Sequence, residues 1–336
     1  MPTVKDVARQ AGVSVGTVSR VLANEPSVKK HLRDKVEAAI LELKYRPNFA
    51  ARALRTNQID MIGFIVPDIT NPFFAQLAQG IEAQVDMRGH TVMLASSHND
   101  PKVELKHINA FIDRSARGIV IIAVSDIKNF DIKTDIPIVS LDRRFADYPL
   151  VATNHIAGAT LVADHLYDLG HRHIAYIAGS KNTEVGRARQ LGFEQRIHQL
   201  SSSRDPIQLD IHFGRFDYES GEEIARQILN VPLEQRPTAI AAASDQQAIG
   251  TLRVARDLEL KLPHELSVAG FDDITLAHLV VPRLTTVRQP TDELARRALE
   301  IVFSEVKDNS DHTIDGVLIH RGSTSEFGKP APRIER

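Results

Sequence analysis

Residues 61–66 of the chain read MIGFIV, a continuous apolar run as long as one β-strand, and the residues after it decide the fold class. A polar loop comes next, and apolar side chains then recur every three to four residues from Phe74 to Val85, which is the spacing of one helix face. Gly89 interrupts this helix pattern before a second strand-like run at residues 91–95. Apolar runs that alternate with helices are typical of a parallel sheet covered on both faces. The stretch therefore predicts an α/β fold.

The same order of elements occurs again further along the chain. A helix pattern at residues 156–169 is followed by Gly170 and by the apolar run 173–178. Other strand-like runs, most of them separated by helix patterns, lie at residues 119–124, 136–141, 239–243 and 266–270. Two similar halves predict a core of two lobes, each built on a doubly wound parallel sheet.

Length and composition limit the class of protein. With 336 residues, of which 43% are hydrophobic, the chain can bury a large core and is long enough for two or three domains. No apolar run is long enough to span a bilayer, and the N-terminus lacks the pattern of a signal peptide, so we expect a cytoplasmic protein without a membrane partner. The absence of cysteine excludes disulfides, thiolate metal sites and cysteine nucleophiles.

The net charge of −2 conceals two regions of opposite sign. Residues 1–59 contain 11 basic and 5 acidic residues, whereas the remaining 277 residues contain 30 basic and 38 acidic ones. A basic head beside an acidic body favours a head that binds a polyanion, although such an excess is more often only a solvated surface.

The head, residues 1–46, carries the patterns of three helices. A first helix ends at Gly12, Ser14 is a suitable N-cap for a second, and a third runs from about residue 28 to residue 44. A small structural bundle or a protein-docking module has the same pattern. The second helix, however, exposes hydroxyl groups and Arg20, a combination that suits recognition of bases and phosphates in a DNA major groove.

Residues 47–58 join the head to the body. Pro47 cannot continue a helix from upstream, and Asn48 is a suitable N-cap for a new helix that runs to about Arg55. A helix of roughly eight residues is marginal on its own in water. It should therefore form only against a surface that receives its apolar side, which includes Leu54.

The head and the joint resemble a known family. Residues 3–22 (TVKDVARQAGVSVGTVSRVL) closely resemble the N-terminal signature of the lac repressor/galactose repressor (LacI/GalR) family, and residues 45–54 resemble its hinge helix. The resemblance implies that bases are read by Val15, Gly16 and Arg20 and that phosphates are held by Ser14, Thr17 and Ser19. It also implies DNA contacts in and beside the hinge from Tyr45, Asn48, Ala51 and Leu54, with Leu54 wedged into the minor groove. Two positions depart from this pattern, because Gly16 has no side chain with which to read a base and Ala23 stands where the family often has Asn.

Ligands of doubly wound sheets bind outside the carboxyl ends of the strands, so the loops after the apolar runs form the candidate site. These loops, which are rich in hydrogen-bonding groups, include residues 67–74, 142–144, 179–183, 244–246 and 271–273. Any one of these residues is also compatible with a helix cap or a surface ion pair. Taken together, carboxylates, guanidinium groups and aromatic rings suit a small ligand with hydroxyl or carboxylate groups.

The body resembles the effector-binding core of the same family, which is similar to periplasmic sugar-binding proteins. The resemblance rests on short motifs such as NPFF at 71–74, GFDD at 270–273 and LTTVRQP at 284–290. It implies effector contacts from Phe73, Arg143, Arg189, Phe216, Asp245 and Asp272. It also implies a core at residues 59–336 with discontinuous lobes, the first at about 60–155 and 289–318 and the second at about 156–288 and 319–336.

The sequence offers no support for an enzyme. The loop after the first strand, residues 67–71, lacks the Gly-x-Gly-x-x-Gly turn of dinucleotide-binding enzymes, and no phosphate-binding P-loop occurs. His171 and His173 have no further metal ligands nearby in sequence, so a turn and a strand start are a better interpretation than a metal site. We therefore expect no catalytic residues, no metal and no cofactor.

These features predict a sequence-specific DNA-binding transcription regulator, and the resemblance favours a repressor over an activator. Its partners would be a palindromic operator and a small polar effector such as a sugar, a sugar acid or a sugar phosphate. We expect a homodimer or a higher oligomer, because one helix-turn-helix reads too few base pairs to define a genomic site. The alternative is a periplasmic-type sugar-binding protein without DNA function, against which the basic head and the missing signal peptide both argue.

Overall fold

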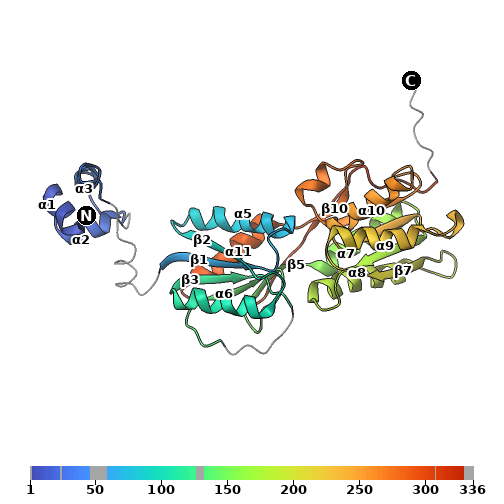
Figure 1. Cartoon of the computed structure of the whole chain (residues 1–336), viewed down its shortest axis with the longest axis horizontal. Helices are drawn as coiled ribbons and strands as arrows, with labels where there is room; N and C mark the ends of the chain where they lie inside the picture. Colours follow the sequence, from blue (N-terminus) through green and yellow to red (C-terminus); the bar gives the residue numbers. More distant parts are fainter. Residues whose placement is uncertain (1, 23–24, 46–58, 126–131, 307, 329–336) are drawn as a thin grey trace, which may run out of the picture. The chain divides into compact units, whose positions relative to one another are not determined.

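The computed structural model describes residues 2–22, 25–45, 59–125, 132–306 and 308–328. The chain divides into two compact units, Met1–Ile59 and Asp60–Arg336, whose elements are labelled in Figure 1. Residues 47–58, for which the sequence predicts a hinge helix, lie outside the described part of the chain. None of the described helices is long and apolar enough to cross a lipid bilayer.

The head contains the three predicted helices, α1 (Val4–Ala11), α2 (Val15–Leu22) and α3 (Lys30–Glu42). Thr3 caps α1, because its backbone amide donates to the Asp6 carboxylate at 2.8 Å while its hydroxyl accepts from the Asp6 amide at 3.4 Å. Gly12 then ends the helix at a φ of 66°, a conformation that glycine adopts at little cost. The side chains at the centre of the head, Val7, Val18 and Val36, come one from each helix and are fully buried.

The first sheet of the body defines a lobe that we call the N-lobe. Its strands lie in the order β11-β5-β4-β3-β1-β2. They are β1 (Ile59–Val66), β2 (Thr91–Ser96), β3 (Ala116–Ile121), β4 (Ile138–Leu141), β5 (Leu150–Thr153) and β11 (His312–Ile314). The pairs β1–β2, β3–β4, β4–β5 and β5–β11 are parallel. The alternation of strands and helices after residue 61 thus forms the predicted parallel sheet.

The second sheet defines the C-lobe, with the strand order β12-β10-β9-β8-β6-β7. Its strands are β6 (His173–Ala178), β7 (Gln208–Phe213), β8 (Ala239–Ala242), β9 (Ser267–Asp272), β10 (Thr285–Arg288) and β12 (Val317–Ile319). The edge strand β12 runs antiparallel to β10, whereas the pairs β10–β9, β9–β8, β8–β6 and β6–β7 are parallel. The predicted α/β class with two doubly wound lobes is confirmed.

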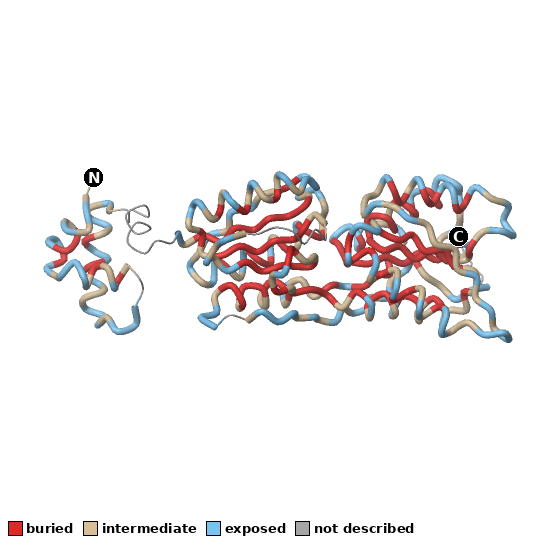
Figure 2. Tube along the Cα trace, turned by 90° about the horizontal axis from the view of Figure 1, so that it is seen from below, coloured by how far each residue is buried: buried red, intermediate tan, exposed pale blue. Residues whose placement is uncertain are grey.

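Helices cover both faces of each sheet, so most strand residues are buried, as the tube in Figure 2 shows. In the N-lobe, α5 (Pro72–Asp86) and α11 (Thr291–Phe303) pack together on one face, and α6 (Pro101–Asp113) covers the other. In the C-lobe, α7 (His155–Asp168) and α8 (Glu184–Leu200) cover one face, while α9 (Tyr218–Leu229) and α10 (Asp245–Asp257) cover the other. Two 3₁₀ turns, Leu233–Gln235 and Thr275–His278, complete the C-lobe.

The chain crosses between the lobes three times, from β5 into α7, from β10 into α11 and from β11 into β12. Asn154 joins two of these crossings, since its amide groups donate to the Ile314 carbonyl at 2.8 Å and to the Asp315 carboxylate at 2.9 Å. Each lobe is therefore assembled from segments that are far apart in the sequence.

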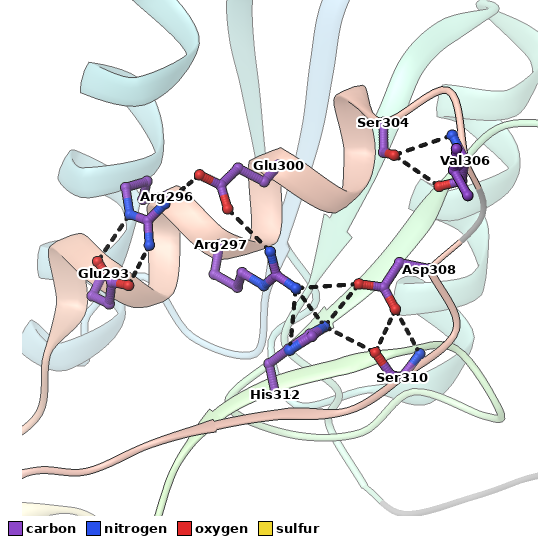
Figure 3. Close-up of polar contacts among 9 residues, drawn as sticks. All are labelled: Glu293, Arg296, Arg297, Glu300, Ser304, Val306, Asp308, Ser310 and His312. Atoms are coloured by element: carbon purple, nitrogen blue, oxygen red, sulfur yellow. Dashed lines mark hydrogen bonds and ion pairs between the residues drawn. The ribbon is translucent and has the colours of Figure 1, made fainter.

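A polar network holds the last segment of the N-lobe in place (Figure 3). Arg297 on α11 donates to Glu300 at 3.2 Å and to Asp308 at 3.3 Å, and His312 at the start of β11 lies 3.0 Å from the same Asp308 carboxylate. Hydrogen bonds from Ser310, together with His312, lower the pKa of Asp308 to about 2. These contacts attach the loop after α11 to the strand that follows it.

Candidate functional site

The exposed side of α2 carries the predicted DNA-reading residues. The Ser14 hydroxyl accepts from the Thr17 amide at 3.1 Å and so caps the helix. Val15, Gly16 and Arg20 are exposed, whereas Thr17 and Ser19 are half-buried. Val18 and Val21 face the head core. The helix thus presents a short apolar group, an arginine and a capped N-terminus on one side, which suits contact with base edges and phosphates.

The structure places only one of the four predicted hinge contacts. Tyr45 is half-buried against the head core, and its amide donates to the Ile40 carbonyl at 2.9 Å. Asn48, Ala51 and Leu54 lie outside the described residues.

A cavity of about 830 Å³ lies at the carboxyl ends of the strands of both lobes. Its N-lobe wall consists of Asp68, Thr70, Asn71, Phe74, Asn99, Pro101, Val124, Ser125 and Arg143. Its C-lobe wall consists of Ser180, Asn182, Thr183, Arg215, Phe216, Asp217, Tyr218, Glu219 and Gln246. The volume is in the range of small-molecule sites, and the wall combines hydroxyl, amide, carboxylate and guanidinium groups with aromatic rings.

Two of the predicted effector contacts, Arg143 and Phe216, line this cavity. The Arg143 guanidinium carbon lies 5.2 Å from the centre of the Phe74 ring and 5.7 Å from that of Phe216, so it sits between aromatic rings of the two lobes. The end of the Phe216 ring packs against the chain at Gly179, where a β-carbon would lie only 2.0 Å from the ring atom Cζ. A glycine at position 179 is therefore required for Phe216 to occupy this place.

Arg189 and Asp272 lie just below the cavity wall. The Arg189 guanidinium donates to the Asp272 carboxylate at 3.0 Å and to the Ala243 carbonyl at 2.6 Å, and it lies 5.8 Å from the ring of Phe216. Burial raises the pKa of Asp272 to about 6, although Arg189 and a hydrogen bond from Gln289 act in the opposite direction. The pair thus forms a charged floor beneath the aromatic ring.

The remaining two predicted contacts occupy other places. Asp245 accepts from the Thr286 hydroxyl and, at 2.8 Å, from the Ile274 amide, so its fully buried carboxylate joins α10 to β10. Phe73 packs in the N-lobe core and does not line the cavity, whereas its neighbour Phe74 does. Asp245 and Phe73 therefore lie in the interior of the lobes and not on the cavity wall.

Several lining residues were missing from the predicted contacts, among them Phe74, Arg215, Tyr218 and Gln246. Phe74 and Gln246 lie in loops that the sequence had marked as candidates, whereas Arg215 and Tyr218 follow β7, a strand that the sequence analysis did not predict. Among the described residues, no group of three His, Cys, Asp or Glu side chains is arranged to hold a metal ion.

A helix-turn-helix head on a two-lobed core with a polar cavity defines a class of ligand-controlled DNA-binding regulators. Comparison with known proteins agrees with this class. Residues 3–48 match the family model described as bacterial regulatory proteins, lacI family, and residues 163–324 match the periplasmic binding protein-like domain. The chain belongs to the LacI family.

Curated relatives span nearly the whole chain. It is 33% identical over 311 residues to the ribose operon repressor of Halalkalibacterium halodurans, covering 91% of each protein. It is 32% identical over 331 residues to the transcriptional repressor CytR of Escherichia coli, covering 96% of each.

Solved structures show the same fold. The lac repressor dimer bound to operator and the anti-inducer ONPF has a TM-score of 0.78 and 26% identity, and the match covers 96% of this chain and 99% of that one. A LacI family regulator from Enterococcus faecium with bound ribose has a TM-score of 0.66 and 26% identity, with 80% of this chain and 99% of that one covered.

Proposed function

We propose that this protein is a transcriptional repressor whose affinity for its operator is controlled by a sugar or sugar derivative bound in the 830 Å³ cavity. The observation that carries the proposal is the wall of that cavity. Phe74 and Phe216 offer ring faces for the apolar side of a sugar, and the surrounding carboxylates, amides and guanidinium groups suit its hydroxyls. The names of the ribose operon repressors and the ribose-bound neighbour support a pentose as the first candidate.

Residues 1–46 are proposed to read DNA, and residues 47–58 to form the hinge that contacts the minor groove. In this proposal Val15, Gly16 and Arg20 contact bases, Ser14, Thr17 and Ser19 hold phosphates, and Leu54 is the wedge. The basic head and the exposed side of α2 support this assignment. A protein with this role acts in the cytoplasm, where the operator is.

A second copy of the chain is the proposed partner of the N-lobe edge. Strand β2 is an edge strand, yet Met93 and Leu94 on it are 44% and 42% exposed. A groove of about 540 Å³ lined by Ile69, Pro72, Val92 and Leu94 lies beside it. An exposed apolar edge of this kind is normally covered, and a two-fold axis there would match a palindromic operator. The neighbour that is a lac repressor dimer supports this choice.

Two measurements on the full-length protein test the proposal. A thermal-shift screen with D-ribose, other pentoses, hexoses, sugar acids and sugar phosphates should find a compound that raises the melting temperature. Fluorescence polarisation with DNA from upstream of its own gene should then show specific binding that the compound changes. Specific DNA binding that no sugar alters would overturn the sugar assignment, and failure to bind any such DNA would favour a binding protein without DNA function.

Two further experiments distinguish sugar binding from sugar turnover and a repressor from an activator. Chromatography of the sugar after incubation should recover it unchanged, as expected of a regulator. Deletion of the gene should raise expression of the adjacent operon, whereas a fall would indicate an activator.

A further inference from the structure

His155 is the first residue of α7, directly after a crossing of the chain from the N-lobe to the C-lobe. The residue before it, Asn154, ties this crossing to the one at Ile314 and Asp315. Any rotation of one lobe against the other therefore changes the backbone close to His155.

One side of the His155 ring faces the floor of the cavity. The Arg189 Nε donates to His155 Nδ1 at 3.3 Å. Since a guanidinium is always a donor, Nδ1 must accept, and the proton of a neutral imidazole must then lie on Nε2. An Nδ1 that accepts a hydrogen bond carries no proton, so the ring is neutral in this arrangement, and burial acts in the same direction because it lowers the pKa of His155.

The other side of the ring faces the opposite lobe. His155 Nε2 lies 3.4 Å from Asp142 Oδ1, and Asp142 follows strand β4 of the N-lobe. Within the part of the chain that the structure describes, both atoms are buried and neither has an aligned hydrogen-bond partner. Asp142 also holds a φ of 60°, a backbone conformation that residues other than glycine adopt only at a cost.

A second buried histidine shows what a purely structural role looks like in this protein. His171 makes contacts at 2.9 Å with Thr238, 3.0 Å with Ser267 and 3.1 Å with the Ser325 carbonyl, so both of its ring nitrogens are satisfied. His155 instead has one hydrogen bond within its own lobe and one unaligned contact to the other lobe. A contact of that kind changes readily with a small rotation of the lobes.

We propose that His155 is a positioning residue that couples the cavity to the N-lobe, holding Arg189 through Nδ1 and meeting Asp142 through Nε2–H. This inference rests on the proposed function for its consequence, because a sugar that moves Arg189 would tighten or break the contact between His155 and Asp142. Its structural content, a bridge from Arg189 to Asp142 through one imidazole, does not depend on which sugar binds.

Nitrogen-15 NMR of the full-length protein labelled at histidine tests the bridge without any effector. The His155 signals, assigned by their loss in His155→Gln, should show a neutral ring with the proton on Nε2. They should shift when Asp142 is replaced by Asn. A proton on Nδ1, or signals unaffected by Asp142→Asn, would overturn the proposal.

The coupling between sugar binding and operator binding is tested by measuring operator affinity twice, without sugar and with saturating sugar, and taking the ratio of the two values. The sugar is D-ribose or the compound that raised the melting temperature. His155→Phe should lower this ratio about tenfold while the sugar still binds, and His155→Gln, which retains a donor and an acceptor, should keep most of it. His198→Phe, on an exposed position of α8, should leave the ratio unchanged.

A ratio of operator affinities in His155→Phe equal to that of wild type would overturn the proposal that His155 couples the cavity to the N-lobe. A wild-type protein that no sugar releases from or recruits to DNA would instead overturn the proposed function, and the NMR result would then decide the bridge alone.

Discussion

The Arg189 guanidinium and the Asp272 carboxylate meet at 3.0 Å inside the C-lobe, where both side chains are almost fully buried. Gln289, which follows the crossing strand β10, donates to the same Asp272 oxygen at 2.7 Å. A carboxylate held in this way is fixed in position before a ligand arrives, so its contribution to binding carries little cost of ordering.

Asp272→Asn should weaken sugar binding by at least about tenfold, because the buried Arg189 guanidinium beneath Phe216 loses its charged partner and the floor of the cavity loses its fixed arrangement. Operator affinity in the absence of sugar should stay within about twofold of wild type. Calorimetry with the sugar and polarisation with operator DNA measure the two quantities, and circular dichroism checks the fold. Full sugar affinity in the variant would contradict the position assigned to Asp272.

The same carboxylate predicts a pH dependence of sugar binding. Burial raises the pKa of Asp272 to about 6, so the wild-type carboxylate becomes protonated as the pH falls below about 6. Sugar affinity should fall in that range, and the Asn variant should lack this part of the pH profile. Calorimetric titrations from pH 7.5 to pH 5 compare the two proteins.

Gly179→Ala should lower sugar affinity about tenfold, since its β-carbon would lie 2.0 Å from the Phe216 ring and the ring must move out of the cavity wall. Gly16→Ala is the matched control, because the nearest atom to its β-carbon is the Ser14 hydroxyl at 3.7 Å. That control should leave sugar affinity unchanged and stabilise the head by about 0.5–1 kcal/mol through helix propensity. Equal sugar affinities in wild type and Gly179→Ala would mean that Phe216 does not contact the ligand.

Arg20→Ala should lose discrimination mainly at one base pair in each half-site, at a cost of about 1–3 kcal/mol for that position. Polarisation with a set of single-base operator variants measures this loss. Arg9→Ala on α1, an arginine with 81% side-chain exposure, is the control and should not change the base preference. Uniform weakening across all sequences would make Arg20 a phosphate contact instead.

His171 predicts how the stability of the core depends on pH. Burial lowers its pKa from 6.5 to about 4, so between these values the unfolded chain binds a proton that the folded protein does not. The free energy of unfolding is therefore highest above pH 6.5, where His171 is neutral in both states. It decreases as the pH falls toward 4, by about 3 kcal/mol once the pH is below both pKa values.

Urea unfolding at pH 7 and pH 4.5 measures this change. His171→Asn should be less stable at pH 7 and should show a smaller loss on acidification than wild type. Carboxylates with raised pKa values titrate in the same range, so the difference between the two proteins, and not the wild-type slope, isolates His171. An equal loss of unfolding free energy between pH 7 and pH 4.5 in the two proteins would contradict the role assigned to His171.

The sheets could be predicted from the sequence because long apolar runs such as residues 61–66 have few alternatives to a buried strand. The short strands β11 and β12 have only three residues each, which is too short a run to carry such a pattern. Their place is set by the crossings between the lobes, which depend on contacts with residues far away in the sequence.

The cavity was predictable as a region and less so residue by residue. Arg143 and Phe216 follow strands and do line it. The choice between Phe73 and Phe74 depends on the rotation of α5 about its axis, and two adjacent aromatic residues at a helix start do not reveal it. Asp245 also follows a strand, but its carboxylate already accepts hydrogen bonds from the Thr286 hydroxyl and the Ile274 amide. These partners are far from Asp245 along the chain, so the sequence alone does not reveal them.

The discontinuity of the N-lobe has a consequence for the order in which the protein folds during synthesis. Leu294, Ala298 and Leu299 of α11 are fully buried in the N-lobe core, and strand β11 completes its sheet at residue 314. On the ribosome, the head can fold once its few dozen residues have emerged, whereas the first lobe must wait for nearly the whole chain. Its exposed strands are then open to misassembly for most of translation, and chaperones that bind apolar segments would protect it during that interval.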